Sequence, residues 1–377
     1  MRNRSVLVAH ACVWSLILFL LAGGLVMAAE RSPSCEVLLF NNPAVKADLY
    51  NPIADQKLPV EGFPSVYTCV RDLPTGEKVH VRLTVTNATG VPLRSEQAEL
   101  TPAGSLVSWR VRWEAPLAAP AAAEITVRQG DHTWVYRESL PLHRLWGRIT
   151  DVSGAPRPGY VIALGYEGLM ARADRDGEYE LWVPETPLPA VVALDDSWAK
   201  TTVETWIHDW YPQHDLRLDP RLGQIELYEL HAWRGYSGLK VDFIPLSIGL
   251  GDRLMKAVGR EAFYQYYGRL SDAKPLLNRE DISVELNGKP LQLRGFWPRM
   301  EAMGEEKESG GRENSRPEYT LQLVDAPHDG EPGQTQVLRV TVTHSHLLDG
   351  KLVEERGEGY YLGLRSYWWA TSASLRE

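Results

Sequence analysis

Aromatic side chains that could hold a ligand are concentrated between residues 198 and 233. An exposed tryptophan can stack on the flat face of a sugar ring, whereas a buried tryptophan adds a large apolar surface to a core or a domain interface. On an extended strand Trp206 and Trp210 share a face, because side chains alternate with a period of two. The candidate carbohydrate-binding cluster, for which packing is the favoured alternative, consists of Trp198, Trp206, Trp210, Tyr211 and Trp233.

Two pairs of histidines could bind a metal ion. His208 and His214 lie in one short stretch with Asp209, and His344 and His346 are two residues apart on a predicted strand, where they share a face. Imidazole nitrogens and carboxylates are common ligands of zinc. However, His208 and Asp209 point to opposite faces of a strand, and the sequence fixes no third ligand for the second pair. A metal-dependent hydrolase is therefore one hypothesis, and we expect the protein to use no cofactor.

The sequence lacks the short motifs that carry common catalytic mechanisms. It contains no G-x-S-x-G nucleophile elbow, no phosphate-binding P-loop and no glycine-rich dinucleotide fingerprint after a strand. No pair of carboxylates is set apart by its spacing as the acid and base of a glycosidase. These features favour a protein that is not an enzyme.

The first 29 residues have the three parts of a secretion signal. Arg2 and Arg4 are basic, residues 11–22 are apolar, and small residues end the segment just before Glu30. The apolar run is also about long enough to be an uncleaved membrane anchor. We expect cleavage, which would make the mature chain periplasmic or extracellular. The membrane is then a partner only if the segment is retained.

The cysteines agree with export. The chain has three, and Cys12 lies within the predicted signal. Cys35 and Cys69 remain, and an even number of cysteines in an oxidising compartment favours a disulfide. The sequence therefore predicts a Cys35–Cys69 disulfide, with two free thiols as the alternative.

The net charge limits the partners. Removing residues 1–29 leaves 38 basic and 49 acidic residues, a net charge of −11. Nucleic acid and anionic lipid repel a negative chain, so we expect neither as a main partner. An envelope protein or a polysaccharide is the expected partner.

Residues 30–143 alternate apolar and polar side chains in several short runs. The clearest runs are residues 78–86, 106–113 and 124–128. A period of two indicates strands that bury one face, and several such strands separated by turns indicate a sandwich. We predict an Ig-like β-sandwich here.

Residues 144–222 form a second run of strands and turns. Residues 147–161 read GRITDVSGAPRPGYV, residues 174–184 read DRDGEYELWVP, and residues 215–220 read DLRLDP. This pattern of turn glycines and alternating strands resembles the carboxypeptidase regulatory-like family. The resemblance implies a small transthyretin-like sandwich that accompanies other domains and is not catalytic.

Residues 223–377 form a third unit, again of alternating strands. A helix is predicted over residues 251–270, where apolar residues follow helical spacing and no proline interrupts them. Asn287-Gly288 predicts a hairpin turn, since both central positions of a type I′ turn need a positive φ. Residues 302–317 lack apolar periodicity and contain two adjacent glycines, so they are predicted to form a mobile loop.

These features together predict an all-β protein of tandem β-sandwich domains. The expected divisions are a signal peptide (1–29), an Ig-like domain (30–143), a regulatory-like domain (144–222) and a C-terminal β-rich domain with one helix (223–377). The leading functional hypothesis is an exported, non-catalytic binding or scaffold protein of the cell envelope. The alternatives are a carbohydrate-binding protein that uses the aromatic cluster and the metal-dependent hydrolase.

Overall fold

The described chain is almost entirely β-structure, with one α-helix among the described residues, which confirms the prediction of an all-β protein of tandem sandwiches. The predicted signal peptide (1–29) and Trp198 lie outside the described residues. No helix in the described stretches is both long and apolar enough to cross a membrane. The computed structural model describes residues 32–41, 46–51, 56–61, 64–87, 89–112, 121–164, 170–194, 202–235, 238–259, 262, 274–305, 313–324, 334–348 and 350–364.

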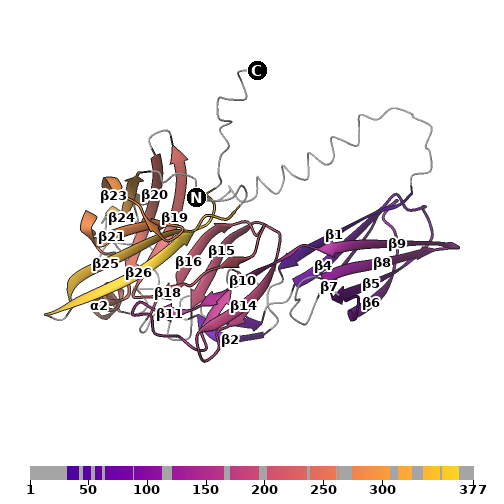
Figure 1. Ribbon diagram of the computed structural model, residues 1–377, viewed down its shortest axis with the longest axis horizontal. Coiled ribbons are helices and arrows are strands. Elements are labelled where there is room, and N and C mark those ends of the chain that lie inside the picture. The colour runs from indigo at the N-terminus through magenta and orange to yellow at the C-terminus, as the bar shows by residue number, and fades with distance from the viewer. Residues whose placement is uncertain are drawn as a thin grey trace, which may run out of the picture.

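The N-terminal unit is a two-layered β-sandwich at one end of the molecule (Figure 1). Its strands are β1 (Ser34–Asn41), β4 (Pro64–Arg71), β5 (Val79–Asn87), β6 (Pro92–Leu100), β7 (Val107–Arg112), β8 (Ala121–Gln129) and β9 (His132–Leu140). Between β1 and β4 the chain forms a hairpin of β2 (Lys46–Asn51) and β3 (Gln56–Glu61), which reaches the middle unit (Figure 1). One layer has the order β1-β4-β7 and the other β6-β5-β8-β9. The alternation of side chains along a strand determines which of them form the core. In β5 every second residue from Val79 to Val85 is buried between the layers.

The prediction of a Cys35–Cys69 disulfide is wrong, because both cysteines are free thiols. They lie on neighbouring strands, but Cys35 is opposite Val70 and Cys69 is opposite Glu36. Directly opposed residues of an antiparallel pair point to the same face, so an offset of one position sends the two thiols to opposite faces of the sheet. Burial, followed by the charge of Glu138, raises the pKa of the Cys35 thiol to about 12, which keeps it protonated.

The middle unit is a second sandwich, separated from β9 by a single residue. Its strands are β10 (Leu142–Arg148), β11 (Thr150–Asp151), β12 (Val161–Ala163), β13 (Met170–Arg172), β14 (Glu178–Pro184), β15 (Leu188–Leu194), β16 (Thr205–Trp210), β17 (Leu216–Arg217) and β18 (Arg221–Leu222). One layer has the order β14-β10-β17, and the other begins β13-β12-β15-β16. As alternation predicts, Tyr179, Leu181 and Val183 of β14 are all buried in the core.

The C-terminal unit packs a four-stranded sheet against the end of a larger one. Its elements are β19 (Ile225–Gly235), β20 (Gly238–Ser247), α2 (Ile248–Val258), the short 3-10 helix η3 (Arg279–Asp281), β21 (Ile282–Leu286), β22 (Lys289–Pro290), β23 (Leu293–Glu305), β24 (Glu313–Leu323), β25 (Leu338–Leu348) and β26 (Lys351–Tyr361). The four-stranded sheet has the order β19-β20-β24-β23. Its inner side chains share one core with those of β21, β25 and β26.

The helix and the loop predicted in this unit both have different bounds. The helix α2 begins at Ile248 because the Ser247 hydroxyl accepts a hydrogen bond from the Leu250 N–H at 3.0 Å, and it ends at Val258. Residues 263–273 lie outside the described part. Much of the loop predicted over 302–317 is instead paired strand, since β23 extends to Glu305 and β24 begins at Glu313. Strand pairing depends on backbone hydrogen bonds, which a polar sequence supplies as well as an apolar one.

The middle and C-terminal units share one sheet. Strand β16 pairs in parallel with β26, with Ile207 opposite Tyr360 and His208 opposite Tyr361. The result is an eight-stranded sheet in the order β13-β12-β15-β16-β26-β25-β21-β22, which takes strands from both sides of residue 222 (Figure 1). The sequence boundary between these two units is therefore not a boundary between sheets.

Two glycines allow the chain around the start of β19 to approach the backbone of β26 closely. A Cβ atom on Gly357 of β26 would lie against the carbonyl group of Ile225, at the start of β19. A Cβ atom on Gly223 would likewise lie against the carbonyl group of Arg356. Only a residue without a side chain permits so close an approach of two backbones.

A buried ion network lies beside these glycines. Glu358 of β26 is fully buried, and its carboxylate lies 3.6 Å from Arg221, 3.8 Å from Arg339 and 3.4 Å from Arg356. The Tyr360 hydroxyl also donates a hydrogen bond of 2.7 Å to it. Because breaking a buried ion pair leaves an uncompensated charge, the network ties β18 and β25 to β26.

Gly357→Ala should destabilise the middle and C-terminal units together, because the new methyl group has no room beside Ile225. We expect a loss of about 1–3 kcal/mol and a lower Tm, with both units unfolding in one calorimetric transition. Gly235→Ala is the control, since the nearest atom to its Cβ would be 3.8 Å away. An unchanged Tm, or separate transitions for the two units, would contradict the shared sheet.

Candidate functional site

The outward side of the β19-β20-β24-β23 sheet carries aromatic and polar side chains in two rows across the strands. The residues between these rows, such as Val241 and Leu321, point inward and are fully buried. Two further side chains, Arg299 and Glu318, face each other beside the second row. We call the whole set the outer face. Its first row is Trp233, Lys240, Gln322 and Gly295, and its second is His231, Asp242, Thr320 and Trp297.

Trp297 is the most exposed aromatic side chain of the outer face, with 49% of its surface accessible. It lies two residues after Gly295 on β23, and three adjacent atoms of its six-membered ring come within 2.8 Å of the position that a Cβ on Gly295 would occupy. The ring therefore folds back over the glycine and keeps its other side in solvent. Burying half of an indole against backbone restricts the ring without hiding it, which is the arrangement of a stacking platform.

Polar groups surround this platform. Arg299 forms ion pairs with Glu318 and, at 3.9 Å, with the Asp242 carboxylate. One oxygen of Asp242 is buried and has no hydrogen-bond partner among the described atoms. The Asp242 side chain as a whole is 21% exposed, so the accessible part of its carboxylate can accept a hydrogen bond from a ligand hydroxyl.

The far end of the outer face is built around Trp233. His231 stacks on Trp233 with ring centroids 5.6 Å apart, and meets Tyr361 edge-on at 5.3 Å. The His231 Nδ1 atom also lies 3.8 Å from the Asp209 carboxylate. Trp233 and Gly295 are three strand spacings apart, about 14 Å, so the two tryptophans flank a long, shallow surface.

The structure separates the tryptophans that the sequence groups together. Trp206 and Trp210 do not share a face, because Asp209 between them has a left-handed backbone with a φ of 54°. Trp210 is only 1% exposed and packs in the main core of the middle unit, beyond reach of a ligand. Trp206 packs against a smaller cluster, and Tyr211 is half-buried just after β16. Of the predicted aromatic residues that the structure describes, Trp233 is the one on the outer face.

Trp206 instead joins two buried carboxyl groups at the joint of the middle and C-terminal units. Its indole N–H lies 3.1 Å from Glu204 Oε2 and 2.5 Å from Glu226 Oε1. Glu226 is fully buried and Glu204 nearly so. Burial, followed by the charge of Glu204, raises the pKa of Glu226 well above its ordinary value of 4.5. Glu226 therefore keeps its proton to a higher pH than an exposed glutamic acid does.

The predicted histidine pairs do not assemble into a metal centre. His208 is half-buried on β16, where burial lowers its pKa, and His214 is exposed in the turn after that strand. The rings of His344 and His346 stack 5.6 Å apart on β25, with the first near Asp281 and the second near Glu355. Within the part of the chain that the structure describes, no three histidine, cysteine or acidic side chains converge as metal ligands do.

Sequence reasoning missed Trp297, although a signal for it exists. Residues 293–297 read LRGFW, and alternation sends Phe296 inward and Trp297 outward if the segment is a strand. A glycine two residues before an outward-pointing tryptophan leaves space for the indole ring to pack against the backbone. The charge-rich stretch that follows obscured the strand.

The similarity of this chain to known proteins is limited to solved structures. No protein-family model and no curated protein matches it. Solved structures with which it aligns include a "putative carbohydrate binding protein" from Bacteroides uniformis (12% identity, 58% of this chain and 98% of that one, TM-score 0.18). Others are a DUF3823 family protein from Bacteroides ovatus (8%, 59% and 100%, 0.18) and BcpA, the major pilin subunit of Bacillus cereus (8%, 51% and 70%, 0.19). At these TM-scores the alignments assign no site or function here.

Glu226→Gln should stabilise the protein at neutral and higher pH, because the amide keeps the neutral form that the buried site favours. With a raised folded-state pKa, the contribution of Glu226 to stability is complete below about pH 4.5 and is lost as pH rises through that pKa. We expect the variant to gain about 1 kcal/mol or more at pH 8 and little at pH 4, measured as Tm against pH. Exposed Glu354→Gln is the control. A gain that does not grow with pH would contradict the raised pKa of Glu226.

Proposed function

We propose that the protein is an exported, non-catalytic binding protein of the cell envelope that binds a neutral carbohydrate on the outer face. The observation that carries the proposal is the Trp297 ring, which lies over Gly295 and keeps one side half exposed. An exposed aromatic face offers apolar contact to the C–H side of a sugar ring, and it does so without a deep pocket.

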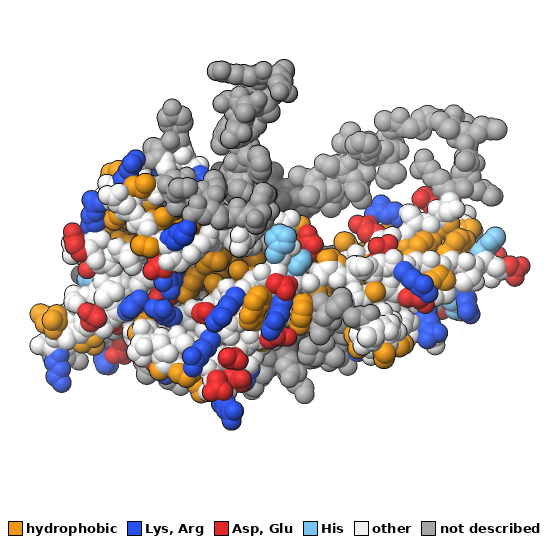
Figure 2. Space-filling model, viewed as in Figure 1, with side chains coloured by type: hydrophobic (Ala, Val, Ile, Leu, Met, Phe, Trp, Pro, Cys, Tyr) orange, Lys and Arg blue, Asp and Glu red, His pale blue; other side chains and the backbone are white. Residues whose placement is uncertain are grey.

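The polar groups of the outer face fit the hydroxyl groups of a sugar. Asp242, Thr320 and Gln322 stand beside one another in the two rows, and the Asp242 side chain is partly exposed. The two cations Lys240 and Arg299 balance the two carboxylates Glu318 and Asp242, and Arg299 is paired with both of them. Acidic and basic side chains are also interspersed over the visible face of the molecule in Figure 2. A local balance of charge favours a neutral ligand over an anionic polymer.

The extended shape of the outer face favours a chain of sugars over a single one. Trp233 and the Trp297 ring lie at opposite ends of the same row, about 14 Å apart by strand spacing. A linear oligosaccharide could contact both rings while its hydroxyl groups meet the polar side chains between them. This assignment keeps the polysaccharide partner expected from the sequence and replaces most of the residues first considered for it.

The remaining parts of the proposal come from the sequence. Residues 1–29 have the features of a signal peptide, which supports a periplasmic or extracellular location. The resemblance of residues 144–220 to the carboxypeptidase regulatory-like family supports a non-catalytic module that holds its neighbour in place. On this proposal the two N-terminal units are the scaffold and the four-stranded sheet is the binding element.

Trp297→Ala should weaken carbohydrate binding by about tenfold or more, because the stacking surface is removed from an exposed position where folding does not need it. Affinity electrophoresis against β-glucan, xylan and soluble chitin oligomers would find the ligand, and calorimetry would give the Kd. Gly295→Ala should also weaken binding, since its methyl group displaces the ring. Exposed Leu352→Ala is the control. Equal binding by the Trp297 variant, or no binding of any of these glycans by the unaltered protein, would contradict the proposal.

A further inference from the structure

The two rows of the outer face divide into four pairs of residues, one pair on each strand. In each pair the first-row and second-row residues are two positions apart, so both side chains leave the sheet on the same side. The two outermost strands carry aromatic rings, with Trp233 beside His231 on β19 and the Trp297 ring over Gly295 on β23. Neighbouring pairs are one strand spacing apart, about 4.8 Å. The tryptophans therefore mark the two ends of a row that is four strands wide.

The two middle strands carry polar pairs. Lys240 and Asp242 on β20 lie directly opposite Gln322 and Thr320 on β24, and all four residues are partly exposed. An ammonium group donates hydrogen bonds and a carboxylate accepts them, whereas a hydroxyl or an amide group does both. Each middle strand therefore offers at least one donor and one acceptor to the hydroxyl groups of a sugar.

The spacing of these pairs is close to the length of one sugar in an extended glycan chain. In a β-1,4-linked chain of pyranose rings with equatorial linkages, the two glycosidic bonds leave each ring on opposite sides. Each sugar then advances the chain by nearly its full length, which is close to the strand spacing of about 4.8 Å. An α-1,4-linked chain leaves each ring through an axial bond and coils instead. A straight row across four strands is therefore matched by the extended chain and not by the coiled one.

The twist of the sheet does not prevent this alignment. Neighbouring strands are rotated by about 20–25°, so the two ends of the row face directions about 60–75° apart. The axis of this rotation runs across the strands, along the row itself. A single glycan chain in solution can turn about its own axis by a similar angle at each sugar. Soluble oligosaccharides are therefore ligands that can follow the row.

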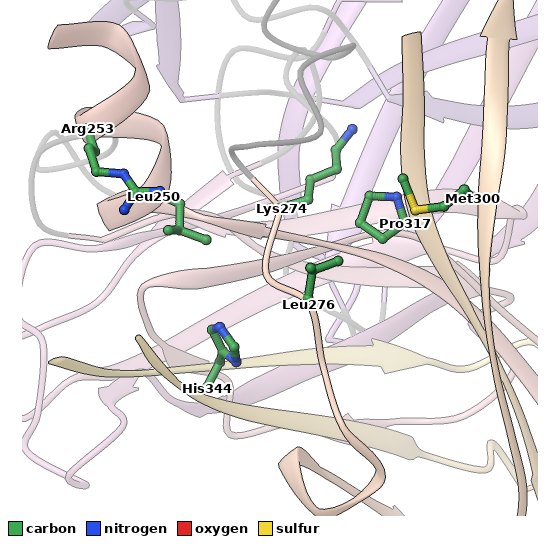
Figure 3. A pocket seen from close by; sticks show the side chains of 7 residues that line it. All are labelled: Leu250, Arg253, Lys274, Leu276, Met300, Pro317 and His344. Atoms are coloured by element: carbon green, nitrogen blue, oxygen red, sulfur yellow. The ribbon is translucent and has the colours of Figure 1, made fainter. Parts of the chain in front are cut away.

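The cavity beside α2 is a less suitable place for a sugar. It has a volume of about 460 Å³, and Figure 3 shows its side chains around a common space. Its described lining includes no tryptophan or tyrosine on which a sugar could stack. His344 lies 3.7 Å from the Asp281 carboxylate, and Arg253 donates a hydrogen bond of 3.5 Å to a backbone carbonyl. The outer face, and not this cavity, therefore offers stacking rings together with accessible polar pairs.

We infer that the outer face binds a single, extended β-1,4-linked glycan chain that crosses its four strands with one sugar on each. The inference rests on the proposed function and adds the linkage, the length and the direction of the bound chain. Trp297 and Trp233 contact the two end sugars, and the polar pairs of β20 and β24 meet the hydroxyl groups of the two middle ones. Among the described strands β23 is the last of this sheet, so a longer chain continues past it.

Calorimetry on the intact protein with oligosaccharides of two to six sugars tests the inference. The β-1,4-linked series are cello-, xylo- and N-acetylchito-oligosaccharides, and the α-1,4-linked malto-oligosaccharides provide the comparison of linkage. In at least one β-1,4 series the affinity should rise about tenfold or more from two to four sugars, because only the longer chain reaches both rings. From four to six sugars it should change by less than about twofold, and malto-oligosaccharides should bind about tenfold or more weakly at four sugars.

Two variants test the far end of the row. In Trp233→Ala the tetrasaccharide should bind no more than about twofold more tightly than the disaccharide, because its fourth sugar has lost the stacking ring. Lys240→Ala, at a partly exposed position on the next strand, should reduce the same length dependence and serves where the first variant does not fold. Leu352→Ala is the control, because its side chain is 75% exposed on β26, outside the outer face.

The outcomes separate the inference from the proposed function. If Trp297→Ala abolishes glycan binding but the affinity of the unaltered protein does not depend on chain length, the inference fails and the proposed function stands. The same holds if malto-oligosaccharides bind as tightly as the β-1,4 series, or if both variants keep the full length dependence. If no oligosaccharide binds, or if Trp297→Ala leaves binding unchanged, the proposed function itself fails.

Discussion

The parallel pairing of β16 with β26 is the constraint on which the rest of the structure depends. It joins the middle and C-terminal units into one eight-stranded sheet, against which the four-stranded sheet packs. Two glycines at positions 223 and 357 make the approach possible, and the buried Glu358 network holds it. With this sheet in place, the C-terminal unit has a rigid support, and its outward side chains keep fixed positions.

The outer face forms in only one register of β23 against β24. Shifting β23 by one residue against β24 would turn Trp297 inward and Phe296 outward, since side chains alternate between faces. Phe296 of β23 fixes this register, because it packs against the shared core and stacks on the buried Tyr319 ring with centroids 5.7 Å apart. The platform is thus a consequence of core packing on the opposite side of the same strands. A binding surface held in this way needs little ordering when a ligand arrives.

Alternation in the sequence was sufficient to predict the fold class and the buried side of strands such as β5 and β14. It could not predict the parallel pairing of β16 with β26, because the two strands are 150 residues apart and no local pattern records their contact. It also failed at Asp209, where one left-handed residue separates Trp206 from Trp210, and at Cys35, where an offset of one position decides the face. Among the four predicted aromatic residues within the described stretches, Trp233 is the one on the outer face. Its counterpart Trp297 became visible only when β23 was paired across the sheet.

The most direct test of the central claim is NMR of the indole N–H groups during titration with a neutral oligosaccharide. The expected result is a shift of the Trp297 and Trp233 signals at the same ligand concentration, while the signal of buried Trp210 stays in place. That result would place the sugar along the row that joins the two rings. Shifts confined to other tryptophans, or an unmoved Trp297 signal while the sugar binds, would contradict the account of the outer face.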